Sequence, residues 1–415
     1  MAFFDIPLEV IEEIIDSLQD DPAALKACSQ TCQSLLLLCR KYIFRTINLV
    51  TPREANAPSC ITLFGSLLDR NPQISDYVRN LIYYLETPDL FLESVPRTLD
   101  KLHRIQSFQF IGDRRTDWSA LHPDLRESLS HIIHSVTHLD ITFIKALPID
   151  IFIPCRNLIN LKLDSIAGTV TDSYEHGYLK QDAVPRLQSL TLGSSCGRYM
   201  QSLIEAKRSK DIPVLDFGDL RTLSISIGED SDLAVFRALM KVTKKLETFH
   251  CTGRYQHNFI YLLRLTPITL VDLTDGYSDH GASINISTLP TLRRLHFVLL
   301  IEDDIENPLC RICDEFAAFS GYNVVEEIIL EIMIESMIET DNQSSSDSQW
   351  GRLDDLLATG FPRLTRVSLR LEICVFSPAG IVSWERLNKL PEQQFPRLSK
   401  NPIVMFDFSL EVTLI

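Results

Sequence analysis

Two groups of cysteine and histidine residues have spacings that could bind a metal ion. Cys310 and Cys313 form a Cys-x-x-Cys pair, which is half of a zinc-knuckle ligand set. No second such pair and no histidine pair follows at the spacing of a zinc finger. His131, His134 and His138 stand at i, i+3 and i+7, which suits one helix face, but His138 belongs to a predicted strand. We therefore expect no metal site and no cofactor.

The short motifs that usually mark a catalytic site are absent from the sequence. It has no Gly-x-x-x-x-Gly-Lys phosphate loop, no Gly-x-Ser-x-Gly elbow, no His-Glu-x-x-His and no Gly-x-Gly-x-x-Gly after a strand. We predict a protein without catalytic activity. Because catalytic groups can be dispersed along a chain, a hydrolase or transferase on an α/β array remains an alternative, which a bound cofactor or metal would favour.

Composition and charge exclude several classes of partner. The chain has 415 residues, 45% of them hydrophobic, and a formal net charge of -15. Binding to a phosphate backbone requires clustered Lys and Arg, so we expect no nucleic-acid partner. An uninterrupted apolar run of about 18 residues is absent, and Asp5 and Glu9 do not suit a secretory signal, so we expect no membrane partner and a cytoplasmic and/or nuclear location. The 10 cysteines are scattered through apolar segments, which is typical of reduced, buried thiols.

Acidic residues are concentrated in residues 302–355. This window holds fifteen Asp and Glu against Arg311 and Arg352, a net of -13 out of the total of -15. Within it, the polar tract 339–350 predicts a mobile acidic and serine-rich insertion. Such a region could steer a basic protein substrate or be phosphorylated on its serines. The plainer interpretation is that it keeps the protein in solution.

The first fifty residues have the pattern of amphipathic helices. Pro7 suits the first turn of a helix, and Glu9 places negative charge near its positive end. Asp21 can cap a second helix that starts at Pro22, and apolar residues then recur at three- and four-residue steps through Cys39. Two short helices cannot bury this much apolar surface between themselves, so part of it must face the rest of the chain or another protein.

These residues resemble a known family. The run Ile6-Pro7-Leu8-Glu9-Val10-Ile11-Glu12-Glu13-Ile14 is similar to the Leu-Pro-x-Glu-Val-x-x-x-Ile opening of the F-box, with Ile6 in place of the usual leucine. Residues 25–35 resemble the second F-box helix, with Gln33-Ser34 where a tryptophan often follows, and residues 42–47 resemble its closing segment.

The resemblance implies binding to the Skp-family adaptor of a cullin-RING (SCF) ubiquitin ligase. The adaptor would pack on an apolar helix face. The positions that match those packing on or supporting the adaptor are Pro7, Leu8, Val10, Ile11, Ile14, Leu18, Leu25, Cys28 and Cys32. The alternative is a pair of helices that only caps a larger core.

A six-residue pattern, apolar-x-x-apolar-x-apolar, recurs along the rest of the chain at periods of roughly 22 to 39 residues. The last two apolar positions alternate with polar ones, as in a strand with one buried face, and the intervals are long enough for helices. Repeats of this length predict a solenoid. The copies begin at Val78, Ile105, Val136, Leu158, Leu187, Leu220, Leu246, Ile268, Leu292, Val325 and Leu364.

The array resembles irregular leucine-rich repeats, which implies an α/β fold with parallel strands on a concave face and helices on the convex one. An ordinary α/β domain is the alternative. We predict an F-box of short helices at 1–50, a connecting segment at 51–77 and a leucine-rich-repeat-like solenoid at 78–415, with the insertion at 339–350.

Polar residues that alternate with the buried apolar ones would line the concave face, where a protein substrate would bind. A surface that is only solvated is the alternative for each of them. The row is His138, Asp140, Lys162, Asp164, His250, Asp272, Arg294, His296, Glu327, Glu331, Arg366 and Arg370, with Ser189, Thr191, Thr222, Ser224 and Ser226 between them.

The function that we expect is that of an SCF substrate receptor. Residues 1–50 would bind the adaptor, and the repeat array would hold a protein substrate for ubiquitin-dependent degradation. A repeat scaffold for protein–protein interaction outside the ubiquitin system is the main alternative.

Overall fold

The computed structural model describes residues 7–50, 59–113, 116–167, 184–209, 212–227, 230–253, 291–302, 312–313, 316–317, 320–321, 323–336, 346–375 and 388–414. Contacts divide the chain into two compact units. Unit 1 is Met1–Pro185 with Lys207–Val214, and unit 2 is Arg186–Ala206 with Leu215–Ile415. The described residues form an α/β fold with twelve strands in the parallel sheet order β1-β2-β3-β4-β5-β6-β9-β10-β11-β12-β13-β14.

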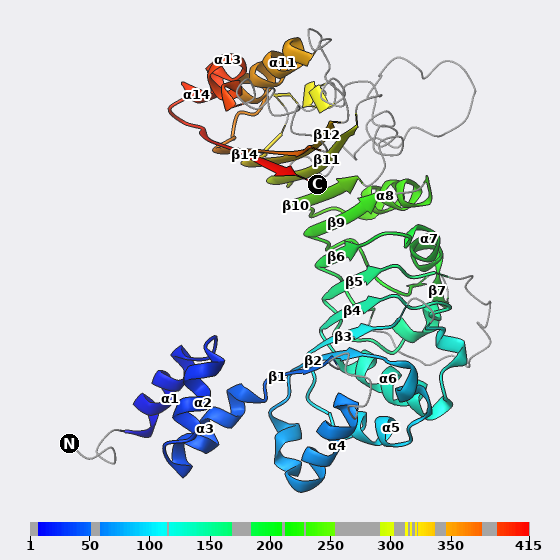
Figure 1. Cartoon of the computed structure of the whole chain (residues 1–415). Helices are drawn as coiled ribbons and strands as arrows, with labels where there is room; N and C mark the ends of the chain where they lie inside the picture. The colour runs from blue at the N-terminus through cyan, green and yellow to red at the C-terminus, as the bar shows by residue number, and fades with distance from the viewer. Residues whose placement is uncertain are drawn as a thin grey trace. The chain divides into compact units, whose positions relative to one another are not determined.

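Unit 1 begins with three helices that share a small core (Figure 1). They are α1 (Leu8–Ser17), α2 (Pro22–Ser29) and α3 (Gln33–Ile43). The buried residues of this core are Ile15, Leu25, Leu35 and Cys39. The Asp21 carboxylate caps α2 by accepting a hydrogen bond from the Ala24 N–H at 2.9 Å, and Pro22 occupies the first turn.

The prediction of one helix from Pro22 through Cys39 was wrong, because α2 ends at Ser29 and a new helix, α3, begins at Gln33. The Thr31 hydroxyl donates to the Cys28 carbonyl at 2.8 Å, a local bond that competes with helix hydrogen bonds. Cys32 is extended, with φ -157° and ψ 162°, and its carbonyl accepts from the Leu36 N–H to start α3. The turn between α2 and α3 lets the two helices pack against each other around Leu25 and Leu35.

The sheet of unit 1 has parallel strands that each pair with the next strand along the chain (Figure 1). Its strands are β1 (Thr46–Leu49), β2 (Asn80–Tyr84), β3 (Ser107–Ile111), β4 (His138–Thr142) and β5 (Asn160–Asp164). The other described helices of unit 1 are α4 (Cys60–Arg70), η2 (Pro72–Asp76), η3 (Thr87–Phe91), α5 (Ser94–Leu99), η4 (Trp118–Ala120), α6 (Pro123–Ser135) and η5 (Ile149–Phe152). Unit 1 also contains a separate two-stranded antiparallel sheet, formed by β7 (Lys207–Ser209) and β8 (Ile212–Pro213).

The helices of unit 1 cover the apolar side of these strands. Alternate residues such as Tyr83, Phe108 and Phe110 are fully buried, and the rings of Tyr83 and Phe110 stack at 6.1 Å. The residues between them, for example Gln109, remain partly exposed. This period of two leaves one polar, solvent-facing side on the sheet.

Unit 2 continues the same arrangement with longer strands. They are β6 (Ser189–Leu192), β9 (Thr222–Ile227), β10 (Thr248–Gly253), β11 (Arg294–Glu302), β12 (Glu327–Ser336), β13 (Arg366–Val375) and β14 (Met405–Leu414). The helices are α7 (Gly197–Glu205), α8 (Asp230–Val242), α11 (Ser346–Thr359), α13 (Leu390–Gln394) and α14 (Pro396–Ser399). Phe395, the residue between α13 and α14, contacts Trp350 of α11 and Phe406 of β14.

The predicted parallel α/β fold is confirmed at the level of the strands. Ten of the repeat copies coincide with strands, and the copy that begins at Ile268 lies outside the described residues. β1 and β14 are parallel strands that the repeat pattern did not predict. Of the segment predicted as an insertion, 339–350, the part from Ser346 onward belongs to α11 and Trp350 is buried; residues 339–345 lie outside the described part.

Other sequence expectations concern cysteines and membranes. Cys39, Cys155 and Cys251 are buried thiols of the described part of the chain. Burial raises the pKa of the Cys155 thiol to about 12. In the described ranges, we find no helix with the length and apolar character needed to cross a membrane.

Candidate functional site

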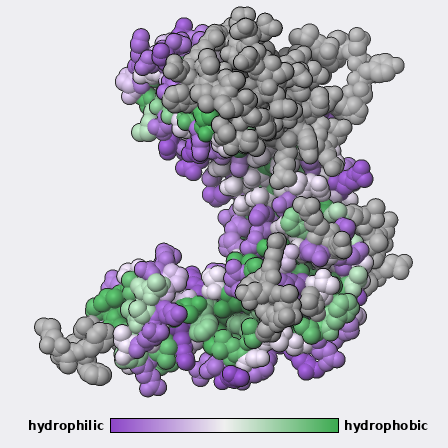
Figure 2. All heavy atoms as spheres, viewed as in Figure 1, coloured by the Kyte–Doolittle hydropathy of each residue, from purple (hydrophilic) through white to green (hydrophobic). Residues whose placement is uncertain are grey.

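Helix α1 exposes two large apolar side chains one turn apart. Val10 is 43% exposed and Ile14 is 51% exposed, whereas Ile15 on the adjacent face of the helix is buried in the three-helix core. Residues i and i+4 lie on the same helix face, so Val10 and Ile14 form one apolar surface. The N-terminal helices carry hydrophobic residues on the face shown in Figure 2.

The other residues of the predicted adaptor-binding set divide by burial. Pro7 and Cys32 are exposed, at the N-terminal ends of α1 and α3. Ile11, Leu18 and Cys28 are half-buried against the three-helix core, and Leu25 is fully inside it, where it supports the helices rather than touching another protein. Leu8 is the first residue of α1, and its side chain lies outside the described part.

In unit 1 the predicted polar row centres on Asp140 of β4. Its Oδ2 accepts hydrogen bonds from Lys162 Nζ at 2.9 Å and from Gln109 Nε2 at 3.1 Å, so three neighbouring strands contribute. Thr142 Oγ1 donates to the other carboxylate oxygen at 3.2 Å. His138 lies on β4, as predicted, and its Nδ1 is 2.7 Å from Thr137 Oγ1. Register therefore brings Asp140 and Lys162 together but leaves His138 two residues away.

In unit 2 the predicted residues Arg294, Glu327 and Arg366, together with Asp407, form a ladder of alternating charge across four strands. Arg294 Nε lies 3.3 Å from Glu327 Oε2, and Arg366 Nη1 lies 3.7 Å from the other oxygen of Glu327. Arg366 also donates two hydrogen bonds, from Nε at 3.1 Å and from Nη2 at 3.0 Å, to Asp407 Oδ2. Each such exposed ion pair contributes at most about 1 kcal/mol to folding, so the ladder is a patterned surface more than a source of stability.

A second group spans β10 to β13: His296 lies two residues beyond Arg294, and Glu331 and Arg370 lie four residues beyond Glu327 and Arg366. The imidazoles of His250 and His296 stack with ring centroids 4.1 Å apart and planes at 3°. His296 Nε2 lies 3.4 Å from Glu331 Oε1, which also accepts a hydrogen bond from Arg370 Nη1 at 2.8 Å. Burial and the neighbouring His296 lower the pKa of His250, against an opposing contribution from Glu331.

The remaining members of the predicted row occupy matching positions. Register places Ser189, Thr222 and Arg294 in one line across the sheet of unit 2, with Thr191, Ser224 and His250 in the next. The Ser224 hydroxyl is 3.3 Å from His250 Nδ1, and Ser226 stands one step along, in register with Thr252. Asp164 of β5 is in register with Thr142, and Asp272 lies outside the described residues.

Sequence reasoning missed several residues of these surfaces. Asp407 completes the charge ladder, but its strand, β14, was not predicted. The signal was present, because Phe406, Phe408, Leu410 and Val412 alternate with polar residues at a period of two. Gln109 and Ser368 also face the polar side, and neutral side chains in a strand give no charge signal of their own.

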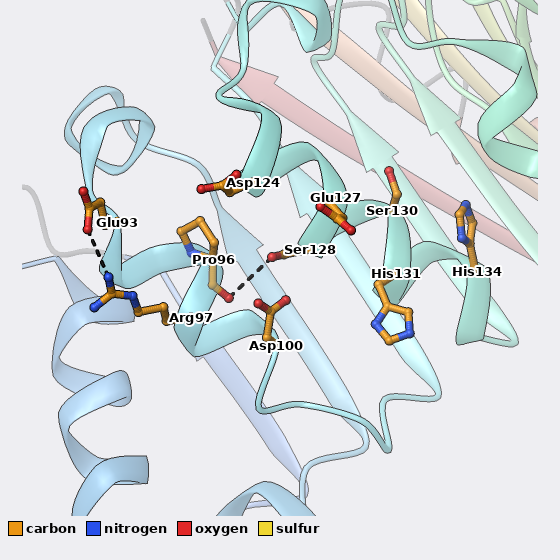
Figure 3. A pocket seen from close by; sticks show the side chains of 10 residues that line it. All are labelled: Glu93, Pro96, Arg97, Asp100, Asp124, Glu127, Ser128, Ser130, His131 and His134. Carbon is orange, nitrogen blue, oxygen red and sulfur yellow. Dashed lines mark hydrogen bonds and ion pairs between the residues drawn. The ribbon is translucent and has the colours of Figure 1, made fainter.

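A cleft on the helical side of unit 1 gathers further titratable groups. Its volume is about 680 Å³, and residues of α5 and α6 line it (Figure 3). Ser128 Oγ donates to the Pro96 carbonyl at 3.5 Å across the cleft, and Arg97 pairs with Glu93 at 3.1 Å. Its walls are Glu93, Pro96, Arg97, Asp100, Asp124, Glu127, Ser128, Ser130, His131 and His134.

The histidines of this cleft are the pair whose spacing suggested a metal site. His131 and His134 lie on α6, and burial together with His131 lowers the pKa of His134. Within the described ranges, no group of three or more His, Cys, Asp or Glu is arranged to hold a metal ion. Cys313 is buried, and Cys310 lies outside the described residues, so the Cys-x-x-Cys pair is not described as a unit.

These surfaces present paired charges and apolar side chains that suit contact with another protein. Comparison with known proteins adds no relative: no protein-family model matches the chain, and a search of curated proteins finds no match either.

Proposed function

We propose that the protein is the substrate-recognition subunit of an SCF-type ubiquitin ligase. In this proposal α1–α3 are an F-box that binds a Skp-family adaptor, and through it the cullin-RING ligase. The observation that carries it is the exposure of Val10 and Ile14 on a helix whose adjacent face already packs against its own core. Apolar side chains of this size, left in solvent side by side, favour a partner surface.

The strands support the second half of the proposal, in which a leucine-rich-repeat-like solenoid holds a protein substrate. Within each unit, strands pair in chain order and helices occupy the intervals on the apolar side. The polar side carries the Asp140–Lys162 pair in unit 1 and the charge ladder in unit 2. Such a surface would select a protein with a complementary pattern of charge.

The proposed role requires no chemistry from this chain. The receptor would raise the effective concentration of a substrate lysine near ubiquitin carried by the attached ligase. It would work in the cytoplasm, the nucleus or both, where that machinery acts.

The decisive test is adaptor binding by a variant that adds charge to α1. Val10→Glu with Ile14→Glu places two carboxylates on the exposed face, where burial against a partner would leave them unpaired. We expect the stoichiometric complex with the adaptor, observed by co-expression and size-exclusion chromatography, to disappear. Loss of two interface anchors corresponds to about 4 kcal/mol, or roughly a thousandfold in Kd.

A matched control separates this effect from a general loss of exposed apolar surface. Leu63 on α4 is 54% exposed, and Leu63→Glu should leave the complex intact. Because Val10 and Ile14 are exposed, circular dichroism of the double variant should match the unchanged protein. An adaptor complex that survives the double substitution would refute the F-box assignment and favour a repeat scaffold outside the ubiquitin system.

A further inference from the structure

β14 is the last strand in the sheet order of unit 2 and has one open edge (Figure 1, red). It pairs with β13 over its whole length, from Met405 opposite Arg366 to Leu414 opposite Val375. No strand of the described part of the chain pairs with its other edge. An unpaired edge of ten residues presents backbone donors and acceptors that can bind another strand.

The backbone groups that face this open edge follow from the register. The Met405 N–H donates to the Thr365 carbonyl of the neighbouring chain segment at 2.8 Å, so Met405 directs its polar groups toward β13. Along a parallel strand, the N–H and C=O groups of one residue point to one neighbouring strand, and those of the next residue point to the other side. The N–H and C=O groups of Phe406, Phe408, Leu410 and Val412 therefore point to the open edge.

The strand lacks the features that usually protect such an edge. Its sequence, Met-Phe-Asp-Phe-Ser-Leu-Glu-Val-Thr-Leu, contains no proline, lysine, arginine or glycine, and its register with β13 is continuous, without a bulge. Met405 is 61% exposed and Val412 is 37% exposed, while Phe406, Phe408 and Leu410 are half-buried. An added strand would cover this apolar side.

The charge beside the edge indicates what the added strand would carry. Glu411 is directly in register with Glu372 of β13, and like charges opposite each other destabilise a sheet. Thr413 Oγ1 donates to Glu372 at 3.2 Å, but no ion pair joins either glutamate to a basic residue of the described chain. By contrast, Asp407 of β14 is paired with Arg366 of β13, and Arg370 of β13 is paired with Glu331 of β12.

We propose that the open edge of β14 binds an extended segment of a partner protein by strand addition, with apolar side chains at alternate positions and a Lys or Arg between them beside Glu411. The inference rests on the proposed function, in which this segment belongs to the captured substrate. The apolar positions cover Phe408 and Leu410, and the cation neutralises the Glu372–Glu411 pair.

A second copy of the chain that pairs through the middle of this edge is disfavoured by charge. Two β14 strands related by a two-fold axis at Ser409 would run antiparallel and place Asp407 of each opposite Glu411 of the other. This puts acid against acid at both ends of the contact. A basic strand from another protein has the complementary charge.

The test measures binding of synthetic peptides to the full chain by fluorescence anisotropy. The probe alternates valine and lysine over about ten residues, the length of the edge. Two controls replace lysine by glutamate or carry N-methyl groups on the edge-facing amides, which removes their hydrogen bonds. We expect the lysine peptide to bind at least tenfold more tightly than either control, with an affinity that falls as salt rises. Equal binding of the three peptides would overturn the proposal.

Variants of the protein locate the site. Leu410→Ala and Leu410→Pro remove the same side chain, but only proline removes the N–H that faces the open edge. We expect Leu410→Pro to bind the lysine peptide at least tenfold more weakly than Leu410→Ala, and Glu411→Gln to reduce the salt dependence. Identical affinities of the alanine and proline variants, with matching thermal unfolding, would contradict strand addition at β14. If the proline variant fails to fold, the N-methyl peptide provides the same test.

The outcome is distinguishable from failure of the proposed function. Adaptor binding depends on α1, so an adaptor complex without peptide binding would refute the edge site alone. Peptide binding without an adaptor complex would support the edge site and refute its link to substrate capture by a ligase. A dimer of the unchanged protein that becomes a monomer on Leu410→Pro would overturn the proposal in favour of a second copy.

Discussion

At the scale of single residues, the surroundings of His250 on the polar face of unit 2 affect its protonation. His250 stacks on His296 and contacts the hydroxyls of Ser224 and Thr252, so its ring is half-buried. Burial favours the neutral imidazole, and a positive charge on His296 would oppose a second one only 4.1 Å away. Glu331 favours the charged form, and it is already shared by Arg370.

This arrangement predicts how stability depends on pH. The pKa of His250 in the folded protein lies below its ordinary value of 6.5, so the unfolded chain binds the proton first as pH falls through 6.5. The free energy of unfolding should therefore decrease below this pH, until the folded protein is protonated as well. His250→Gln should show a smaller drop in urea midpoint between about pH 7.5 and about pH 5.5.

The exposed His103 provides the comparison for this prediction. His103→Gln should keep the full drop in midpoint. An unchanged pH dependence in His250→Gln would show that the stacked pair does not contribute to acid lability.

At the scale of elements, one buried carboxylate fixes the small helix beside β14. Asp354 of α11 is 1% exposed, and its two oxygens accept hydrogen bonds from the N–H groups of Arg397 and Leu398, each at 2.9 Å. These are the free donors in the first turn of α14, where a negative charge is also favoured by the helix dipole. Asp354 therefore links α11 to α14 and positions Phe395 against Phe406.

Replacing this carboxylate should destabilise unit 2. Asp354→Ala leaves two N–H groups without their acceptor, which should cost about 2–4 kcal/mol in the free energy of unfolding, measured by urea denaturation. The next residue is a matched control, since Asp355 forms an exposed ion pair with Arg397 at 2.9 Å. Asp355→Ala should cost about 1 kcal/mol or less. Equal losses in the two variants would contradict this role of Asp354.

At the scale of the whole molecule, the proposed function separates two binding tasks by position in the chain. In this proposal, adaptor contact would depend on the exposed face of α1, and substrate contact would depend on the polar side of the sheet. The two surfaces share no residue. Variants of one should leave the other intact.

This separation predicts opposite phenotypes in cells. Val10→Glu with Ile14→Glu should still bind the substrate but no longer promote its ubiquitylation, so captured protein accumulates. Arg366→Ala should retain the adaptor and lose the substrate, because it removes the guanidinium shared by Glu327 and Asp407. Affinity capture with quantitative proteomics measures both. Arg97→Ala, an exposed arginine on the helical side of unit 1, should change neither partner.

Much of the fold follows from local pattern. The period-two alternation around Leu139 and Ile141, or around Leu161 and Leu163, required strands with one buried face, and the structure has them at those residues. The end of α2 at Ser29 was not predictable in the same way. Apolar residues continue at helical spacing through Cys39, and two shorter helices are favoured by the Thr31–Cys28 hydrogen bond and by the packing of Leu25 against Leu35.

The sequence by itself determined which residues of each strand are polar and which are apolar, because side-chain direction in a strand depends only on its own period. Which charged residues pair across the strands is not determined locally. The ladder from Arg294 through Glu327 and Arg366 to Asp407 depends on the register of four strands separated by many residues. Exposure of Val10 and Ile14, and the open edge of β14, likewise depend on which neighbours the fold supplies. Tertiary structure alone decided these features, because burial and charge pairing are properties of the neighbours and not of the local chain.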